Sequence, residues 1–199
     1  MFVFSLDSPI PWARVFGDGR PVEVEIGPGR GERVLAAAAA CPTVNFFAIE
    51  LRGGAAQAIA DRAAGLGIRN LRVVAGDVRW IFRLLADASV AAYHVHFPDP
   101  WPKTRHRERR LATPAFAREI ARTLAPGGAV HVASDLPPVV EAFARALASA
   151  SLVPVPAAVP PEGRPKSSFE QRYARGGTSY ARFVRDSGRT GAPAPDGAI

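Results

Sequence analysis

The sequence predicts an α/β fold in which a mostly parallel, seven-stranded sheet carries helices on both faces. Short apolar runs alternate with helical stretches along the whole chain, which is the pattern of a parallel sheet covered on both sides. A glycine-rich turn follows the first of these runs, as in folds that bind a ligand at a strand-to-helix turn. The chain has 199 residues with 48% hydrophobic content, which suits one globular domain with a buried core.

The strands and helices follow from these runs in chain order. Strands are predicted over residues 22–26, 44–49, 71–75, 90–97, 129–134, 152–155 and 180–184. Helices are predicted after the glycine turn to about residue 40, then over residues 55–66, 78–85, 113–125 and 136–150. The last strand is expected to close the sheet through an antiparallel hairpin.

Helix ends are marked by residues with defined preferences. Gly65 and Gly67 end the helix at 55–66, because glycine readily adopts the left-handed conformation found there. Thr113 is a suitable N-cap, and Pro114 then takes the first helical position. The segment 125–128, Ala-Pro-Gly-Gly, is expected to stop that helix before the fifth strand.

One domain is predicted, over residues 22–186. Residues 1–21 are expected to form a flexible N-terminal arm, and the tail at 187–199, rich in Gly, Pro and Ala, is expected to be disordered. No segment approaches the roughly 20 apolar residues of a membrane span, and the start has no basic leader, so we expect a cytoplasmic protein that contacts no membrane.

Charge and cysteine content narrow the function classes. The net charge is +7 and the isoelectric point is near 10.6, which favours a polyanionic partner. Cys41 is the only cysteine, so neither an internal disulfide nor a Cys/His zinc site is expected. His94 and His96 are expected to face opposite sides of one strand, and no metal site is predicted.

Three acidic residues accompany the glycine turn, each at or near the end of a predicted parallel strand. The turn places Gly27, Gly29 and Gly31 at every second position before a helix. The acids are Glu25, Glu50 and Asp77. Acids at this edge suit a ligand that is cationic and carries no phosphate, such as S-adenosylmethionine. Glu25 could take its ammonium group, Glu50 its ribose and Asp77 its adenine amino group.

The segment 97–110, Phe-Pro-Asp-Pro-Trp-Pro-Lys-Thr-Arg-His-Arg-Glu-Arg-Arg, follows the fourth strand. Its prolines stiffen the turn, so Asp99 and Trp101 are held in fixed directions. A carboxylate can accept hydrogen bonds from a nucleobase, and an aromatic ring can pack against one. The basic run that follows is a phosphate-binding composition. Together these features indicate an enzyme that acts on a base within a nucleic acid.

The same segment, the Glu-Ile-Gly-x-Gly-x-Gly opening, the pair Ile49-Glu50 and the stretch 169–172, Phe-Glu-Gln-Arg, resemble the bacterial tRNA (guanine-N7)-methyltransferases. The resemblance extends from about Val22 to Arg185. It implies a Rossmann-like class I methyltransferase fold and transfer of a methyl group from S-adenosylmethionine to a guanosine at position 46 in the tRNA variable loop.

The resemblance also implies roles for individual residues. Asp99 would be catalytic, and it would contact the cofactor together with Glu25, Glu50, Asp77 and the three turn glycines. Target-nucleotide contacts would come from Lys103, Asp135, Ser167, Ser168, Phe169 and Glu170. RNA contacts would come from Arg105, His106, Arg107, Arg109 and Arg110.

Two departures from the family pattern bear on function. Ser168 stands where the family usually has Lys, which removes a charge from the substrate segment, and the chain before Val22 is shorter than in many members. Two alternatives therefore stay open: a methyltransferase for another acceptor and a binding-only RNA module. A third, an NAD-dependent oxidoreductase, is disfavoured by Glu25 and by the proline turn after the fourth strand. The sequence leaves open whether the protein is a monomer or a homodimer and which tRNAs it would modify.

Overall fold

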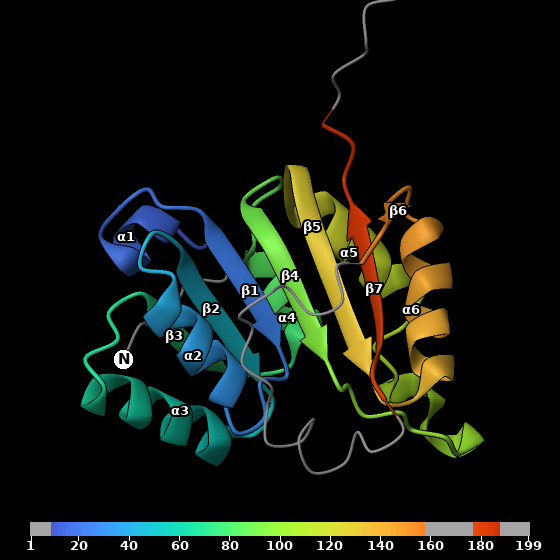
Figure 1. The fold of residues 1–199 in the computed structure, drawn as a ribbon, viewed down its shortest axis with the longest axis horizontal. Helices are drawn as coiled ribbons and strands as arrows, with labels where there is room; N and C mark the ends of the chain where they lie inside the picture. Colours follow the sequence, from blue (N-terminus) through green and yellow to red (C-terminus); the bar gives the residue numbers. More distant parts are fainter. Residues whose placement is uncertain (1–8, 158–176, 188–199) are drawn as a thin grey trace, which may run out of the picture.

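A computed structural model describes residues 9–157 and 177–187. The strands of its sheet are β1 (Val22–Ile26), β2 (Asn45–Glu50), β3 (Leu71–Ala75), β4 (Val90–His96), β5 (Leu124–Ser134), β6 (Val153–Val155) and β7 (Ser179–Val184). Their order across the sheet is β3-β2-β1-β4-β5-β7-β6 (Figure 1). The five strands from β3 to β5 are parallel, and β7 is antiparallel to β5 and β6. The predicted sheet with its antiparallel C-terminal hairpin is confirmed.

The helical elements are α1 (Trp12–Phe16), α2 (Glu32–Ala40), α3 (Gly53–Gly65), α4 (Val78–Ile81), η1 (Phe82–Leu84), η2 (Thr104–Arg109), α5 (Pro114–Thr123) and α6 (Pro137–Ala148), where η marks a 3₁₀-helix. The helix predicted over 78–85 is divided into α4 and η1. Thr113 caps α5 by accepting a hydrogen bond from the backbone N–H of Phe116, and Pro114 follows it, as predicted. Neither α1 nor η2 was predicted.

Two apolar clusters cover the two faces of the sheet. In β2, Phe46 and Ala48 pack with α2 and α3 on one face. Phe47 and Ile49, the alternate residues of the same strand, pack into the larger cluster with side chains of α1, α4, η1, α5 and α6. Because successive strand residues point to opposite faces, one strand serves both cores. The prediction of helices on both faces is confirmed.

The described part of the N-terminal segment, residues 9–21, joins this larger core. Ile10 and Val15 are 4% exposed, and the Trp12 ring meets Phe47 edge-on with centroids 5.0 Å apart. The backbone N–H of Ile10 also donates to the carbonyl of Leu84. A flexible arm was expected here, but residues 9–21 pack against the domain. The sequence did not predict α1 because a helix of five residues is too short to show an apolar period. Residues 1–8 and 188–199 lie outside the described residues.

Strand β5 begins at Leu124, five residues before the predicted start at 129. Val90 pairs with Leu124 and Ala92 with Ala129, so β5 accommodates extra residues at an irregularity. Gly127 has φ +75°, and a Cβ atom at Gly128 would lie 2.8 Å from the carbonyl oxygens of Ala125 and Ala91. The Pro-Gly-Gly segment that suggested a turn is therefore a bulge within the strand.

The expectation that His94 and His96 face opposite sides was wrong. Their ring centroids lie 5.7 Å apart, and His94 also stacks on His131 of β5 at 5.1 Å. Side chains two residues apart in a strand share a face, since the period of a strand is two. Among the described residues, no helix has the length and apolar character needed to cross a lipid bilayer.

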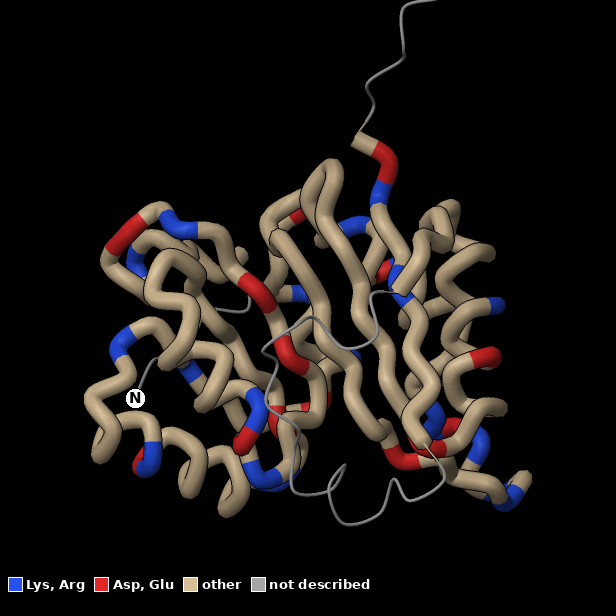
Figure 2. The backbone as a smooth tube through the Cα atoms, in the orientation of Figure 1, with Lys and Arg blue, Asp and Glu red and all other residues tan. Residues whose placement is uncertain are grey.

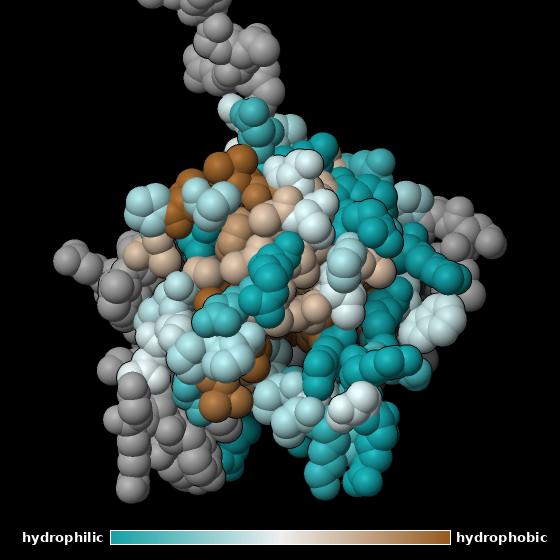
Figure 3. Space-filling model, turned by 90° about the vertical axis from the view of Figure 1, so that its right-hand side faces the viewer, coloured by the Kyte–Doolittle hydropathy of each residue, from teal (hydrophilic) through white to brown (hydrophobic). Residues whose placement is uncertain are grey.

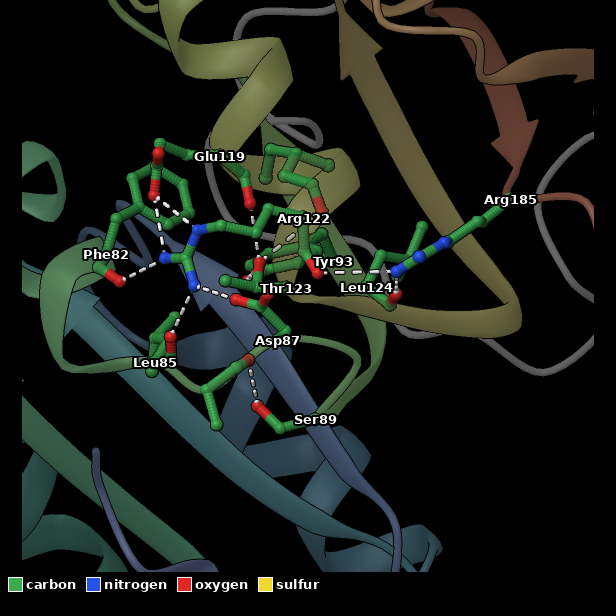
Figure 4. Close-up of polar contacts among 12 residues, drawn as sticks. Phe82, Leu85, Asp87, Ser89, Tyr93, Glu119, Arg122, Thr123, Leu124 and Arg185 are labelled. Carbon is green, nitrogen blue, oxygen red and sulfur yellow. Dashed lines mark hydrogen bonds and ion pairs between the residues drawn. The ribbon is translucent and has the colours of Figure 1, made fainter. Parts of the chain in front are cut away.

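Arg122 joins the end of α5 to the connection that leads into β4 (Figure 4). Its guanidinium donates to the carbonyl oxygens of Phe82 and Leu85 at 2.7 and 2.9 Å. It also forms ion pairs with Asp87 and Glu119. One side chain thus supplies donors to two main-chain carbonyls at the end of η1, where the Phe82 carbonyl also accepts the backbone N–H of Leu85.

We expect Arg122→Met to lower the free energy of unfolding by about 1–3 kcal/mol, because the carbonyls of Phe82 and Leu85 both lose a donor and two ion pairs are lost with them. Urea denaturation followed by circular dichroism measures this. The control is Arg145→Met, since the Arg145–Glu141 pair spans 3.8 Å between exposed side chains. The control should change stability by less than about 0.5 kcal/mol. Equal effects of the two substitutions would contradict the assigned role of Arg122.

Candidate active site

A cleft of about 830 Å³ opens at the carboxyl ends of β1 to β4. Five acids line it: Glu32, and the four predicted acids Glu25, Glu50, Asp77 and Asp99, which are far apart in the sequence. In Figure 2, acidic and basic residues share this lower edge of the sheet, and Lys and Arg gather in the segment after β4. Figure 3, which views the molecule from the side of α6, shows hydrophilic side chains gathered at the same lower end. The predicted meeting of strand-end acids thus occurs in one cavity.

The glycine turn lines the cleft through Gly27 and Gly29, whose φ angles are +68° and +60° with open space around each Cα. Gly31 does not line it. A Cβ at Gly31 would lie 2.6 Å from the Ile59 side chain, so this glycine lets α2 approach α3 closely. The first two glycines can therefore expose backbone to a ligand, while the third serves helix packing.

Glu50 is 5% exposed and holds the turn in place. One of its carboxylate oxygens accepts a hydrogen bond from the backbone N–H of Gly29 at 3.1 Å. The other accepts from the backbone N–H and the Nε of Arg52. Each oxygen keeps further acceptor capacity toward the cleft, because a carboxylate can accept about four hydrogen bonds in all.

Glu25 is also paired with an arginine. Arg33 Nε donates to Glu25 Oε1 at 2.9 Å, and Arg33 Nη2 donates to Oε2 at 2.7 Å. Both side chains are nearly buried, with exposed fractions of 6% and 4%, yet both line the cleft. This fork-to-fork geometry is the strongest form of the arginine–carboxylate contact.

Asp77 caps α4 by accepting from the backbone N–H of Arg79 at 2.9 Å. The Arg79 guanidinium also donates to both Asp77 oxygens, and these bonds hold the pKa of Asp77 below its ordinary value. The same guanidinium donates through Nη1 to the backbone carbonyl of Glu108, at 3.0 Å. Arg79 therefore connects the cleft to η2, the element that carries the basic run.

The proline segment is built around Trp101. Phe97 and Trp101 have φ angles of +49° and +41°, which non-glycine residues seldom adopt. The Arg109 guanidinium lies 4.7 Å from the centre of the Trp101 ring, and His106 meets the ring edge-on at 5.4 Å. Arg110 donates to the backbone carbonyl of Trp101 at 2.9 Å. These contacts hold the strained turn at the rim of the cleft.

Asp99 differs from the other three predicted acids of the cleft. It is exposed, and among the described residues it has neither a hydrogen-bond partner nor an ion-pair partner. Glu25, Glu50 and Asp77 are paired with Arg33, Arg52 and Arg79 in turn. Within the part of the chain that the structure describes, Asp99 is thus the only one of these four acids without an arginine partner.

The remaining predicted residues fall into three groups. Arg105, Arg107 and Lys103 are exposed on or beside η2, with no ion-pair partner among the described residues. Asp135 follows β5 at the same edge but does not line the cleft. Ser167, Ser168, Phe169 and Glu170 lie outside the described residues.

The arginines that pair with the cleft acids were not anticipated. Arg33 is eight residues from Glu25 across the glycine turn, a separation that no local spacing rule connects. The contact of Arg79 with Asp77 was only weakly indicated by the sequence: an Asp at a helix N-cap commonly accepts a hydrogen bond from the backbone N–H two residues later. An arginine at that position can fold back onto the same carboxylate.

Similarity to known proteins was found at the levels of sequence and structure. The family model described as "Putative methyltransferase" matches residues 19–181. A tRNA (guanine-N(7)-)-methyltransferase of Sodalis glossinidius is 38% identical over 178 residues, covering 84% of this chain and 72% of the relative. One of Pseudomonas entomophila is 37% identical over 182 residues, covering 88% and 76%.

Solved structures share the fold. A 16S rRNA (adenine(1408)-N(1))-methyltransferase from Catenulisporales acidiphilia superposes with a TM-score of 0.67 at 17% identity, covering 96% of each chain. The 16S rRNA methyltransferase KamB gives 0.66 at 18% identity, covering 88% of this chain and 92% of the other.

We expect Arg79→Met to raise the pKa of Asp77 toward its ordinary value without reaching it, because the backbone N–H of residue 79 still donates. Carboxyl-detected NMR titration of both proteins measures this. A lowered pKa contributes stability that is present above the unfolded-state pKa of aspartate and is lost as pH falls through the folded value. The stability gap between wild type and variant should therefore shrink on acidification. Arg83→Met serves as the control, and identical Asp77 titrations in wild type and Arg79→Met would contradict the assignment.

Proposed function

The chain belongs to the tRNA (guanine-N(7)-)-methyltransferase family, and from this premise we propose how its cleft performs the reaction. The protein transfers a methyl group from S-adenosylmethionine to N7 of a guanosine in tRNA. The target we propose is position 46 of the variable loop, and the compartment is the cytoplasm, where tRNA is found. We propose no metal for this chemistry.

The acids and glycines of the cleft suit S-adenosylmethionine. Gly27 and Gly29 let backbone approach the ligand. Glu50 has acceptor capacity for the ribose hydroxyls, Asp77 for the adenine amino group, and Glu25 for the ammonium. These carboxylates would repel the phosphates of a dinucleotide cofactor, whereas S-adenosylmethionine has no phosphate. The proposal therefore keeps the cofactor roles predicted for Glu25, Glu50, Asp77, Gly27 and Gly29, whereas Gly31 does not line the cleft.

The observation that carries the catalytic proposal is that Asp99 has no partner among residues 9–157 and 177–187. When bound, S-adenosylmethionine supplies an activated methyl carbon, whose bond to sulfur breaks as its bond to guanine N7 forms. N7 already has an in-plane lone pair, so Asp99 need not remove a proton to create the nucleophile. Positive charge moves from the sulfonium to the guanine ring, and Asp99 stabilises it as it develops. A carboxylate already neutralised by arginine would stabilise this charge less.

We propose that the proline turn that holds Asp99 and Trp101 positions the guanine. Trp101 is braced by Arg109, His106 and Arg110, so its orientation is set before the base arrives. We assign the exposed Lys103, Arg105 and Arg107 to tRNA phosphates, because exposed cations without acidic partners retain their full attraction for a polyanion. Asp135 and the segment 167–170 stay assigned to the target nucleotide on the family resemblance.

Purified protein incubated with S-adenosylmethionine and unmodified tRNA transcript should yield 7-methylguanosine, identified by mass spectrometry after digestion. Asp99→Asn keeps the shape of the side chain and removes its charge, so kcat should fall about 100-fold or more. Cofactor affinity, measured by calorimetry, should change only a few-fold.

The matched control is Asp61→Asn, a substitution on the exposed face of α3, where Asp61 bonds Gln57. It should leave turnover unchanged. A different methylated nucleoside would identify another acceptor, and cofactor binding without any product would favour a binding-only protein. An Asp99→Asn variant with wild-type kcat would remove Asp99 from the catalytic role.

We also expect Arg105→Gln combined with Arg107→Gln to weaken tRNA binding and to flatten its salt dependence. Each lost phosphate contact should reduce the slope of log K against log salt by about 0.7–0.9. Binding titrations at several salt concentrations measure this. The control pair is Arg69→Gln with Arg145→Gln, two exposed arginines away from η2. If both pairs gave the same slope, the basic run would not be the phosphate-contacting surface.

A further inference from the structure

The buried ion pair between Glu25 and Arg33 has a position that its contribution to stability does not explain. Removing two charges from water is costly, and a buried pair is often no more stabilising than apolar side chains of the same volume. This pair nevertheless lies in the wall of the cleft, with both partners facing the cavity. Polar side chains that line a cavity, as these two do, are candidates for ligand contact.

The geometry of the pair leaves one cationic and one anionic edge for a ligand. Arg33 uses Nε and Nη2 for Glu25, and among the described residues its Nη1 has no hydrogen-bond partner. Each Glu25 oxygen accepts one of these bonds and keeps further acceptor capacity. The cleft therefore presents a guanidinium donor and a carboxylate acceptor side by side.

That combination matches the charges of an α-amino acid, in which an ammonium and a carboxylate share one carbon. Glu25 alone would attract the ammonium and repel the neighbouring carboxylate. We infer that Arg33 is a specificity-determining residue that binds the carboxylate of the cosubstrate's methionine end while Glu25 binds its ammonium. This inference rests on the proposed use of S-adenosylmethionine. It gives a role to the buried Arg33, which pairs with Glu25, whereas the sequence pattern assigns the amino-acid end of the cofactor to Glu25 without a partner.

Calorimetry with two ligands tests the inference. The first is S-adenosylhomocysteine, and the second is its decarboxylated analogue, which retains the amine and lacks the carboxylate. Wild type should prefer the first by about tenfold or more, the effect of one charge-assisted hydrogen bond. Arg33→Met should reduce this preference to near one. The ratio is informative because a general loss of folded protein would weaken both ligands equally.

The control is Arg52→Met, which removes an arginine from the other buried acid of the cleft, Glu50. It should leave the preference at its wild-type value. Arg33→Gln, which keeps a donor for Glu25 without the charge, provides a second variant if Arg33→Met does not fold, and it should also lose the preference.

Equal weakening of both ligands by Arg33→Met or Arg33→Gln would overturn the inference and leave Arg33 as a residue that only positions Glu25. A wild type that binds both ligands equally would also overturn it. Failure of the proposed function would look different, because wild-type protein would then bind neither ligand.

Discussion

The site depends on a constraint of chain topology, the reversal of strand order between β1 and β4. From β1 the chain proceeds outward to β2 and β3 and then crosses back to β4 on the other side of β1. The connections therefore diverge at the carboxyl ends of β1 and β4 and leave a cleft between them. The four predicted acids of the site are placed by this geometry, because each lies near the end of a parallel strand or shortly after it, and the register of these strands is set by their neighbours.

Charge compensation within the cleft gives its four predicted acids, Glu25, Glu50, Asp77 and Asp99, different chemistry. Glu25, Glu50 and Asp77 each form an ion pair with an arginine, which offsets the negative charge of the carboxylate and fixes its orientation. The fourth, Asp99, retains its charge at the point where the proline turn meets the cavity. A site of four bare carboxylates would bind cations indiscriminately and would be hard to fold, since like charges repel in a low-dielectric environment. The arginines thereby allow a crowded acidic site to exist.

The sequence was sufficient for most of the sheet and for the place of the acids, because period and strand-end position are local properties. It was insufficient where local signals conflict with tertiary pairing. Pro126-Gly127-Gly128 has the composition of a turn, yet it lies inside β5 because β4 supplies a partner on either side. The partnership of Glu25 with Arg33 is equally invisible, since it depends on how the glycine turn brings α2 back over β1. The role of Gly31 in packing against Ile59 needed coordinates for the same reason.

The dual contact of Arg79 has a thermodynamic consequence. Its guanidinium bonds Asp77 in the cleft and the carbonyl of Glu108 in η2, so the two regions share one side chain. A ligand that changes how Asp77 holds this guanidinium changes the free energy of η2 as well. Linkage is reciprocal: if the small ligand changes the affinity for the polyanion by some factor, the bound polyanion changes the affinity for the small ligand by the same factor. A single arginine can thus couple the affinities of the two substrates by the same factor, whichever of them binds first.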